Sequence, residues 1–217
     1  MLFILDLDGT LLNTIEDLAT ATNRALQACG FAVRTSEECK QFVGNGVTKL
    51  LERALPEGHK NPENIVRMKE AFFAYYDAHL TDFTRPYAGI VKALTALQQD
   101  GVYLAVASNK YQRATSALIA HFFPQISFAA VQGQRDGVPV KPHPQMVQEI
   151  LQAAGQTPEQ TLYVGDSDVD MQTAQNAGVK ACGVTWGFRS RECLAAYQPT
   201  YLIDKPGQLI EIAKSLG

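Results

Sequence analysis

The sequence predicts an α/β protein: a Rossmann-like parallel sheet core sandwiched by helices, with an inserted all-helical cap domain. Beyond residue 85, short apolar runs alternate with segments of helical periodicity, a pattern that produces βαβ units and a parallel sheet. Between the first apolar run and that point, helical patterns follow one another without a strand. We therefore expect a core domain of residues 1–13 and 85–217 and a helical cap domain of residues 14–84.

The first apolar run, residues 2–7, is interrupted by Asp6 and followed by Asp8, Gly9 and Thr10. Asp-Gly is a strong turn signal, so the two acids lie at or just past the carboxyl end of a buried strand. Open α/β sheets gather their ligands at this end of their strands. We therefore expect both carboxylates to serve one site.

Capping and turn residues set the expected bounds of the other elements. Thr14 and Asp17 have capping-box spacing, Thr35 offers a second N-cap, and Pro62 stands at a first helical position. The expected cap helices cover residues 14–29, 35–43, 47–54 and 61–80. In the core we expect helices at residues 90–99, 112–121, 144–154, 168–177 and 207–215, and strands at residues 102–107, 128–131, 161–164, 179–184 and 200–203.

Composition excludes several classes of partner. With 46% hydrophobic and 19% charged residues the chain is typical of a globular protein, and its net charge of −3 gives no electrostatic basis for binding nucleic acid or an anionic membrane. It has no apolar run long enough to span a bilayer, and we expect no signal peptide, because a strand is predicted to begin at residue 2. We expect a cytoplasmic monomer or homodimer.

The four cysteines form neither a CxxC pair nor a zinc-like pattern with histidine. They are expected to be free thiols: Cys29, Cys39, Cys182 and Cys193.

Polar residues follow later strands as they follow the first. They are Ser108, Asn109 and Lys110 after residues 102–107, Lys141 in the segment VPVKPHP, and Asp166, Asp168 and Asp170 after residues 161–164. Taken singly, each has an ordinary interpretation as a helix N-cap, a solvated loop cation or acids in the first turn of a helix. Because the carboxyl ends of parallel strands share one edge of a sheet, we expect these groups to converge on one site.

These side chains match the needs of phosphate ester hydrolysis. The reaction requires a nucleophile, a cation and a hydroxyl or amide donor for the phosphoryl oxygens, and an acid for the leaving group. Asp6, Asp8 and Asp166 cannot all stay ionised close together without a cation between them. Oxygen ligands of this kind favour Mg²⁺, which we expect as the cofactor.

The segments LDLDGTLL, VASNK, VKPHP and GDSDVD, in this order, resemble the four motifs of the haloacid dehalogenase-like hydrolase superfamily, and the helical insert resembles its type 1 cap. The opening DLDGTLLNTIEDL, together with KPHP and GDSDVD, is most similar to phosphoglycolate phosphatases and their close relatives. The resemblance spans nearly the whole chain. It implies a phosphatase that hydrolyses a small phosphorylated metabolite, with phosphoglycolate favoured.

The resemblance also implies a role for each matched residue. Asp6 would be the nucleophile that forms an aspartyl-phosphate, and Asp8 the acid–base that protonates the leaving alcohol and later activates water. Ser108 and Asn109 would bind the transferring phosphoryl group. Lys141 would neutralise the charge of that group and hold Asp6.

A metal site is implied in the same way. Mg²⁺ would be held by Asp6, the backbone carbonyl of Asp8 and Asp166. Thr10 and Asp170 would contact these ligands and hold them in place without binding the metal themselves. The resemblance therefore implies a phosphatase that depends on Mg²⁺.

Other activities stay open as alternatives. Asp8 disfavours carbon–halogen cleavage, since dehalogenases with this fold lack this second acid. A sugar phosphomutase would usually carry a histidine in the first cap helix, where residues 14–29 contain none, and a phosphonate hydrolase would need a cap lysine such as Lys40 or Lys49. A receiver-like regulatory phosphoprotein also combines an aspartate, a hydroxyl and a lysine on a parallel sheet, but it has no helical lid.

Two loops, at residues 44–46 and 186–189, and Asp168 are also expected to lie near the site or to shape the elements around it. Gly44, Asn45 and Gly46 follow no strand and lack a third glycine, so a dinucleotide-binding loop is disfavoured, and we expect a cap loop that contacts the non-phosphate end of the substrate. Residues 186–189, WGFR, follow a strand near the site and are expected to form a structural loop. Asp168, between the two matched acids, is expected to face solvent or cap a helix.

Overall fold

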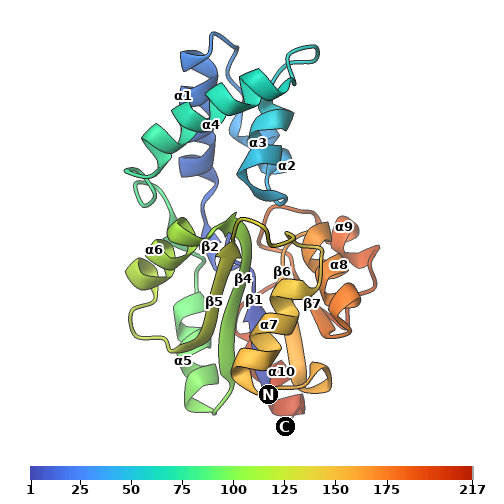
Figure 1. Cartoon of the computed structure of the whole chain (residues 1–217). Coiled ribbons are helices and arrows are strands. Elements are labelled where there is room, and N and C mark those ends of the chain that lie inside the picture. The colour runs from blue at the N-terminus through green and yellow to red at the C-terminus, as the bar shows by residue number, and fades with distance from the viewer. Residues whose placement is uncertain (217) are drawn as a thin grey trace. The chain divides into compact units, whose positions relative to one another are not determined.

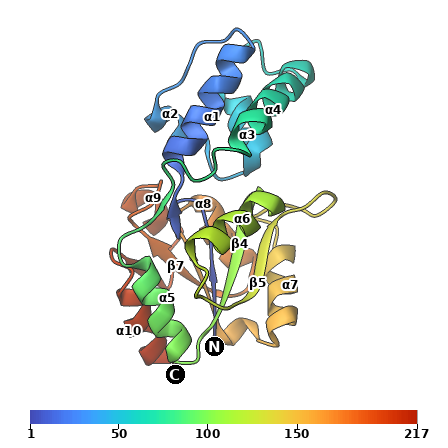
Figure 2. The same cartoon turned by 90° about the vertical axis from the view of Figure 1, so that its left-hand side faces the viewer.

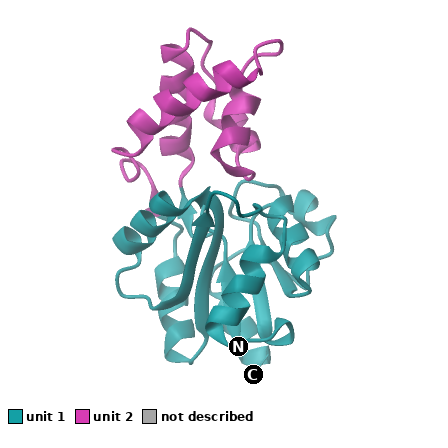
Figure 3. Ribbon diagram, viewed as in Figure 1, with its two compact units in different colours: residues 1–13, 86–217 teal, residues 14–85 magenta. Residues whose placement is uncertain are grey.

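In a computed structural model, which describes residues 1–216, the chain forms two compact units. Unit 1 contains Met1–Asn13 and Pro86–Gly217, and unit 2 contains Thr14–Arg85 (Figure 3). Unit 1 is thus built from two separate stretches of chain, with the whole of unit 2 inserted between them. No helix in the described part of the chain combines the length and the apolar character needed to cross a membrane.

Unit 1 is organised around a six-stranded sheet whose strands all run parallel. Its order is β5-β4-β1-β6-β7-β8, and the strands are β1 (Leu2–Leu5), β4 (Tyr103–Tyr111), β5 (Phe128–Gln134), β6 (Thr161–Gly165), β7 (Lys180–Val184) and β8 (Tyr201–Ile203). Strand β1 is fully buried, as expected for an apolar run in the middle of a parallel sheet. The predicted α/β fold is confirmed.

Helices cover both faces of this sheet (Figures 1 and 2). They are α5 (Ile90–Gln99), α6 (Gln112–Phe122), α7 (Gln145–Ala154), α8 (Asp168–Ala177), α9 (Arg191–Ala195) and α10 (Gln208–Leu216). Helices α5 and α10 contact each other on one side, and α7 lies on the other side, where it contacts α8. One core cluster joins Leu2 and Ile4 of β1 to Met146 and Ile150 of α7. Leu2 and Ile4 therefore pack on the face of the sheet that α7 covers.

The fourth strand differs from the prediction. Strand β4 does not end at Ala107 but continues through three polar residues to Tyr111. Its pairing with β1 stops at Val106, whereas its pairing with β5 resumes at Tyr111 opposite Gln134. The apolar pattern could not indicate this extension, because the polar residues in it are buried by bonds within the site described below. Helix α9 was not predicted either, since five residues are too few to show a helical period.

Unit 2 is helical, with α1 (Ile15–Ala28), α2 (Ser36–Phe42), α3 (Gly46–Ala54) and α4 (Pro62–Tyr76). Thr35 forms a capping box with Glu38, and the Asn61 side chain caps α4 with Pro62 in its first turn, so these predicted helix starts are confirmed. Helix α4 ends at Tyr76, before the predicted residue 80. Two-residue strands β2 (Leu12–Asn13) and β3 (Arg85–Pro86) pair where the chain passes between the units.

The predicted capping box of Thr14 and Asp17 is wrong. Thr14 caps nothing with its side chain. The buried Asp17 carboxylate instead accepts hydrogen bonds from the backbone N–H of Phe83 (3.0 Å) and from the backbone N–H and hydroxyl of Thr84 (2.8 and 2.6 Å). Three donors satisfy a buried carboxylate better than one helix amide would. Asp17 therefore ties the first helix of unit 2 to the segment with which that unit ends.

Candidate active site

The predicted site residues of unit 1 gather at the carboxyl ends of three neighbouring strands. Strand β1 lies between β4 and β6, with Leu5 opposite both Val106 and Val164. Asp6 and Asp166, which follow β1 and β6, and Ser108, in the extended part of β4, therefore lie side by side at this edge of the sheet. Lys141 reaches the same place from the segment before α7.

Lys141 is the electrostatic centre of the site. Its ammonium lies 2.7 Å from Asp6 Oδ1 and 2.8 Å from Asp170 Oδ1, and it is 2% exposed. It also approaches the carbonyl of Ala107 and the hydroxyl of Tyr163, both at 2.9 Å. Burial disfavours the charged form, but Asp170 and Asp6 outweigh it and raise the pKa of Lys141 well above its ordinary value. The residue is a fixed buried cation.

Asn109 positions this cation. Its side-chain Oδ1 accepts from the backbone N–H of Lys141 (2.8 Å), and its Nδ2 donates to the backbone carbonyl of Lys141 (3.0 Å). The Asn109 amide thus binds Lys141 in the way that a neighbouring strand would. Asn109 therefore helps to fix the segment that carries Lys141.

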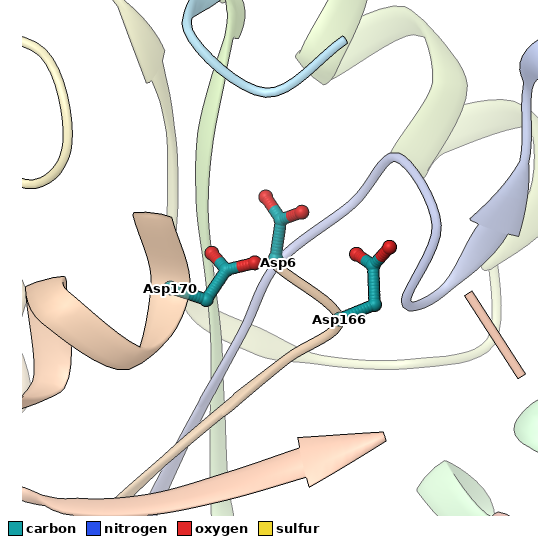
Figure 4. Close-up of side chains that lie close together, drawn as sticks. All are labelled: Asp6, Asp166 and Asp170. Atoms are coloured by element: carbon teal, nitrogen blue, oxygen red, sulfur yellow. The ribbon is translucent and has the colours of Figure 1, made fainter. Parts of the chain in front are cut away.

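Three carboxylates converge beside the cation. Asp6 comes from the end of β1, Asp166 from the end of β6, and Asp170 from the first turn of α8 (Figure 4). Each offers an oxygen within 4.8 Å of the others. Burial, followed by the charge of Asp170, raises the pKa of Asp6 well above its ordinary value and that of Asp166 to about 7. A divalent cation among these oxygens would remove the repulsion, so the residues fit a metal with oxygen ligands.

Asp170 serves two elements at once. Its Oδ2 accepts from the backbone N–H and the hydroxyl of Ser167 (3.1 and 2.6 Å), which completes a capping box at the start of α8. Its Oδ1 is bound to Lys141. Asp170 therefore joins the start of α8 to the buried ammonium of Lys141.

Asp8 stands apart from this cluster and has its own cation. Lys110 Nζ lies 3.1 Å from Asp8 Oδ2, and both side chains are largely buried, at 4% and 12% exposure respectively. The Ser108 hydroxyl accepts from the backbone N–H of Lys110 (3.2 Å) and is itself buried. Ser108 and Lys110 are thus joined within the irregular part of β4, between Ala107 and Tyr111. The two acids of the opening turn, Asp6 and Asp8, therefore have different cationic partners.

Lys110 and Tyr163 also belong to the site, although neither was predicted. A signal for Lys110 was present, since it stands two residues beyond Ser108 in a polar run that follows a buried strand. Tyr163 was hidden inside an apolar strand, yet its hydroxyl lies 2.9 Å from Lys141 Nζ and 3.2 Å from Asp170 Oδ1. A tyrosine within a fully buried strand requires a hydrogen-bond partner, and that requirement was the only available signal.

Three predicted residues lie outside this group, in unit 2. Gly44 and Gly46 have φ angles of +131° and +81°, and Asn45 between them accepts a hydrogen bond from Arg53 (2.8 Å) through its side-chain oxygen. The Asn45 side chain is thus bound within its own unit.

In unit 1, Asp168 is half exposed and lies 3.4 Å from Arg189 in an ion pair.

A family model of haloacid dehalogenase-like hydrolases matches residues 3–184. The chain belongs to this family. This hydrolase is 35% identical to the phosphoglycolate phosphatase of Pseudomonas putida, over 94% of its own length and 76% of that protein, and 32% identical to that of Vibrio cholerae, over 97% and 96%. A crystal structure of a predicted phosphoglycolate phosphatase from Haemophilus somnus is 29% identical and superposes with a TM-score of 0.91, covering 98% of this chain and 97% of the other. The hydrolase is therefore a phosphatase, that is, a phosphoric monoester hydrolase.

Proposed function

We propose that this hydrolase is a Mg²⁺-dependent phosphatase that hydrolyses 2-phosphoglycolate through an aspartyl-phosphate formed on Asp6. The observation that carries the proposal is the contact of 2.7 Å between Asp6 and the buried ammonium of Lys141, beside a second carboxylate, Asp166. A nucleophilic oxygen is thereby fixed next to a cation able to neutralise a phosphoryl group.

In the first step, a carboxylate oxygen of Asp6 attacks phosphorus and the bond between phosphorus and the ester oxygen breaks. Asp8 donates its proton to the leaving alkoxide, which departs as the alcohol. The Ser108 hydroxyl and the Lys141 ammonium stabilise the charge on the phosphoryl oxygens. The products of this step are the free alcohol and phosphorylated Asp6.

In the second step, the Asp8 carboxylate takes a proton from water, and the resulting hydroxide attacks phosphorus. The bond from phosphorus to Asp6 breaks, so inorganic phosphate leaves and both carboxyl groups return to their starting states. Lys110 keeps Asp8 in place throughout, because the ion pair is almost closed to solvent. Separate cations for Asp6 and Asp8 support separate chemical roles for the two acids.

Asp6, the backbone carbonyl of Asp8 and Asp166 would hold Mg²⁺, and Thr10 and Asp170 would support them. When bound, the metal supplies positive charge to the phosphoryl oxygens and to the repelling carboxylates. The raised pKa values of Asp6 and Asp166 support this assignment, since burial and the charge of Asp170 disfavour their ionised forms and a cation would favour them.

The substrate assignment is supported by the names of the relatives, several of which are phosphoglycolate phosphatases at 30% identity or more over nearly the whole chain. Unit 2 would act as the cap that selects the substrate, and Gly44, Asn45 and Gly46 would contact its non-phosphate end. Replacing Asn45 by Ala tests this loop: KM and substrate preference should change. Unaltered values would remove the loop from the proposal.

The function itself is tested with a panel of phosphate esters at matched Mg²⁺ concentration, in which 2-phosphoglycolate should give the highest kcat/KM. Asp6→Asn should abolish turnover, and Asp168→Asn, which changes a neighbouring acid outside the cluster, should leave it intact. Acid-stable labelling of the protein without release of phosphate would instead indicate a regulatory phosphoprotein. A different ester at the top of the panel would contradict the substrate assignment alone.

A further inference from the structure

The Asp166 carboxylate is held by two segments that are far apart in the sequence. Its Oδ1 accepts from the Thr10 hydroxyl (3.1 Å), in the turn after β1, and its Oδ2 accepts from the backbone N–H of Phe188 (2.6 Å), in the loop after β7. One hydrogen bond on each oxygen fixes the rotation of a carboxylate about its own axis. Asp166 is 1% exposed, so water does not replace either donor.

The two segments are also joined directly. The indole N–H of Trp186 donates to the backbone carbonyl of Thr10 at 3.0 Å. Trp186 is the only tryptophan of the chain, and its ring is half-buried. The hydrogen bond closes a ring of contacts that runs from Asp166 through Thr10 and Trp186 to Phe188 and back to Asp166.

Glycine lets both segments approach the carboxylate. A Cβ atom at Gly187 would lie 2.2 Å from the Cβ of Asp166, and one at Gly9, where φ is +93°, would lie 2.3 Å from Asp166 Oδ2. Such distances do not occur between real side chains, so a larger residue at either position would displace the acid or the backbone. The glycines therefore determine how closely the donors surround Asp166.

We propose that residues 186–188 form a clamp that positions Asp166 for metal binding. Trp186 and Gly187 act through Thr10, Phe188 and Asp166, and are positioning residues that touch neither substrate nor the reacting atoms. The inference rests on the proposed function, because it assumes that Asp166 is a ligand of Mg²⁺. It assigns a role to a loop that would otherwise only connect β7 to α9.

Two variants test the clamp. Trp186→Phe keeps an aromatic ring and removes the donor to Thr10, and Gly187→Ala forces a methyl group against Asp166. Mg²⁺ binding is measured by isothermal titration calorimetry on the metal-free protein without substrate. Groups that orient metal ligands typically contribute about 10–100-fold to metal affinity, so we expect the Mg²⁺ dissociation constant to rise by about 10-fold or more in both variants.

Tyr197→Phe is the matched control. It also removes one aromatic hydrogen-bonding group from unit 1, the hydroxyl that accepts from Gln172 (3.2 Å), but it changes no contact of Asp166. Its Mg²⁺ affinity should equal that of the unchanged protein. In Trp186→Phe, kcat should recover at saturating Mg²⁺, and the affinity for inorganic phosphate at that Mg²⁺ concentration should not change, because the clamp acts on a metal ligand and not on the groups that bind phosphate.

The outcomes separate the two proposals. If the unchanged protein binds no Mg²⁺, the proposed metal site and the clamp both fail. If it binds Mg²⁺ and Trp186→Phe binds it within about twofold as well, the clamp alone is overturned, because orienting groups contribute more than this. Should Gly187→Ala fail to fold, as judged by circular dichroism, Trp186→Phe decides the result.

Discussion

The ammonium of Lys110 lies 3.1 Å from the Asp8 carboxylate in an ion pair that is almost closed to solvent. The two residues are 102 positions apart and come from the ends of neighbouring strands. Asp6, two residues before Asp8, is paired with a different cation, Lys141. Each acid of the opening turn thus has a counter-ion of its own, and the two pairs can be tested separately.

Lys110→Met should impair proton transfer while leaving substrate binding largely intact. Without its counter-ion, the Asp8 carboxylate is no longer held toward the leaving group, and we expect kcat to fall by up to about 10²-fold, the lower end of what a positioned acid–base contributes. Steady-state kinetics on the preferred ester measures this. Lys92→Met, which changes an exposed lysine of the same unit, should leave kcat unchanged. An equal loss in both variants would remove Lys110 from the mechanism.

Asp8→Asn should distinguish substrates by their leaving groups. An alkyl phosphate leaves as a strongly basic alkoxide and needs the proton, so its hydrolysis should slow by about 10²–10⁴-fold. p-Nitrophenyl phosphate has a leaving group that departs unprotonated, and its hydrolysis should be affected much less. The ratio of the two kcat/KM values is the measurement. Equal losses on both esters would count against Asp8 as the acid.

Asp170→Ala should destabilise the protein. The change removes one of the two carboxylates that neutralise Lys141. Breaking a buried ion pair costs about 3–5 kcal/mol when the remaining charge has no other partner, and we expect less here because Asp6 still faces Lys141. It also removes the capping box with Ser167 at the start of α8. Urea denaturation compares it with Asp168→Ala, which breaks a partly exposed pair with Arg189 and should cost less than about 1 kcal/mol. Similar losses for the two variants would show that Lys141 does not need Asp170.

The acidic cluster predicts how stability depends on pH in the absence of metal. Because the pKa of Asp166 is raised to about 7, the folded state holds this proton more tightly than the unfolded chain, in which an aspartate titrates at about pH 4. The contribution of the protonated Asp166 carboxyl to the free energy of unfolding is therefore complete below about pH 4 and is lost as the pH rises through about 7. In EDTA, the Tm should therefore fall between about pH 5 and about pH 8, and Mg²⁺ should restore it most at the higher pH.

A matched variant identifies the group responsible. Asp166→Asn cannot ionise, so its Tm in EDTA should change less over the same pH range and should respond little to Mg²⁺. If the variant and the unchanged protein showed the same dependence on pH, the titration would belong to other groups.

Helix starts that depend only on residues close together in the sequence could be predicted from the sequence. The N-cap at Thr35 and Pro62 in the first turn of α4 depend on a few adjacent residues and were predicted correctly. Thr14 and Asp17 have capping-box spacing, but Asp17 is bound by Phe83 and Thr84. A spacing rule cannot include a partner 66 residues away in the sequence.

For the candidate site, residue positions could be named from the sequence but their partners could not. That Asn109 binds the backbone of Lys141, or that Lys110 pairs with Asp8, depends on how β4 continues beyond its apolar part. The approach of Gly187 to Asp166 depends on the path of a loop, which no periodic pattern records. Such contacts arise only when segments that are distant in the chain are folded together.

The place of β1 in the sheet has a consequence for synthesis. Strand β1 leaves the ribosome before β4 and β6, yet in the sheet it lies between them. At an elongation rate of about 5–20 residues per second, β6 follows β1 by roughly 10–30 s. Until β4 has been synthesised, the four consecutive apolar residues Leu2–Leu5 have no neighbouring strand in this sheet, and until β6 follows they are unpaired on one side. Nascent chains arrested before Gly165 should therefore depend on chaperones and aggregate when released, whereas chains that extend past β6 should be able to close the centre of the sheet.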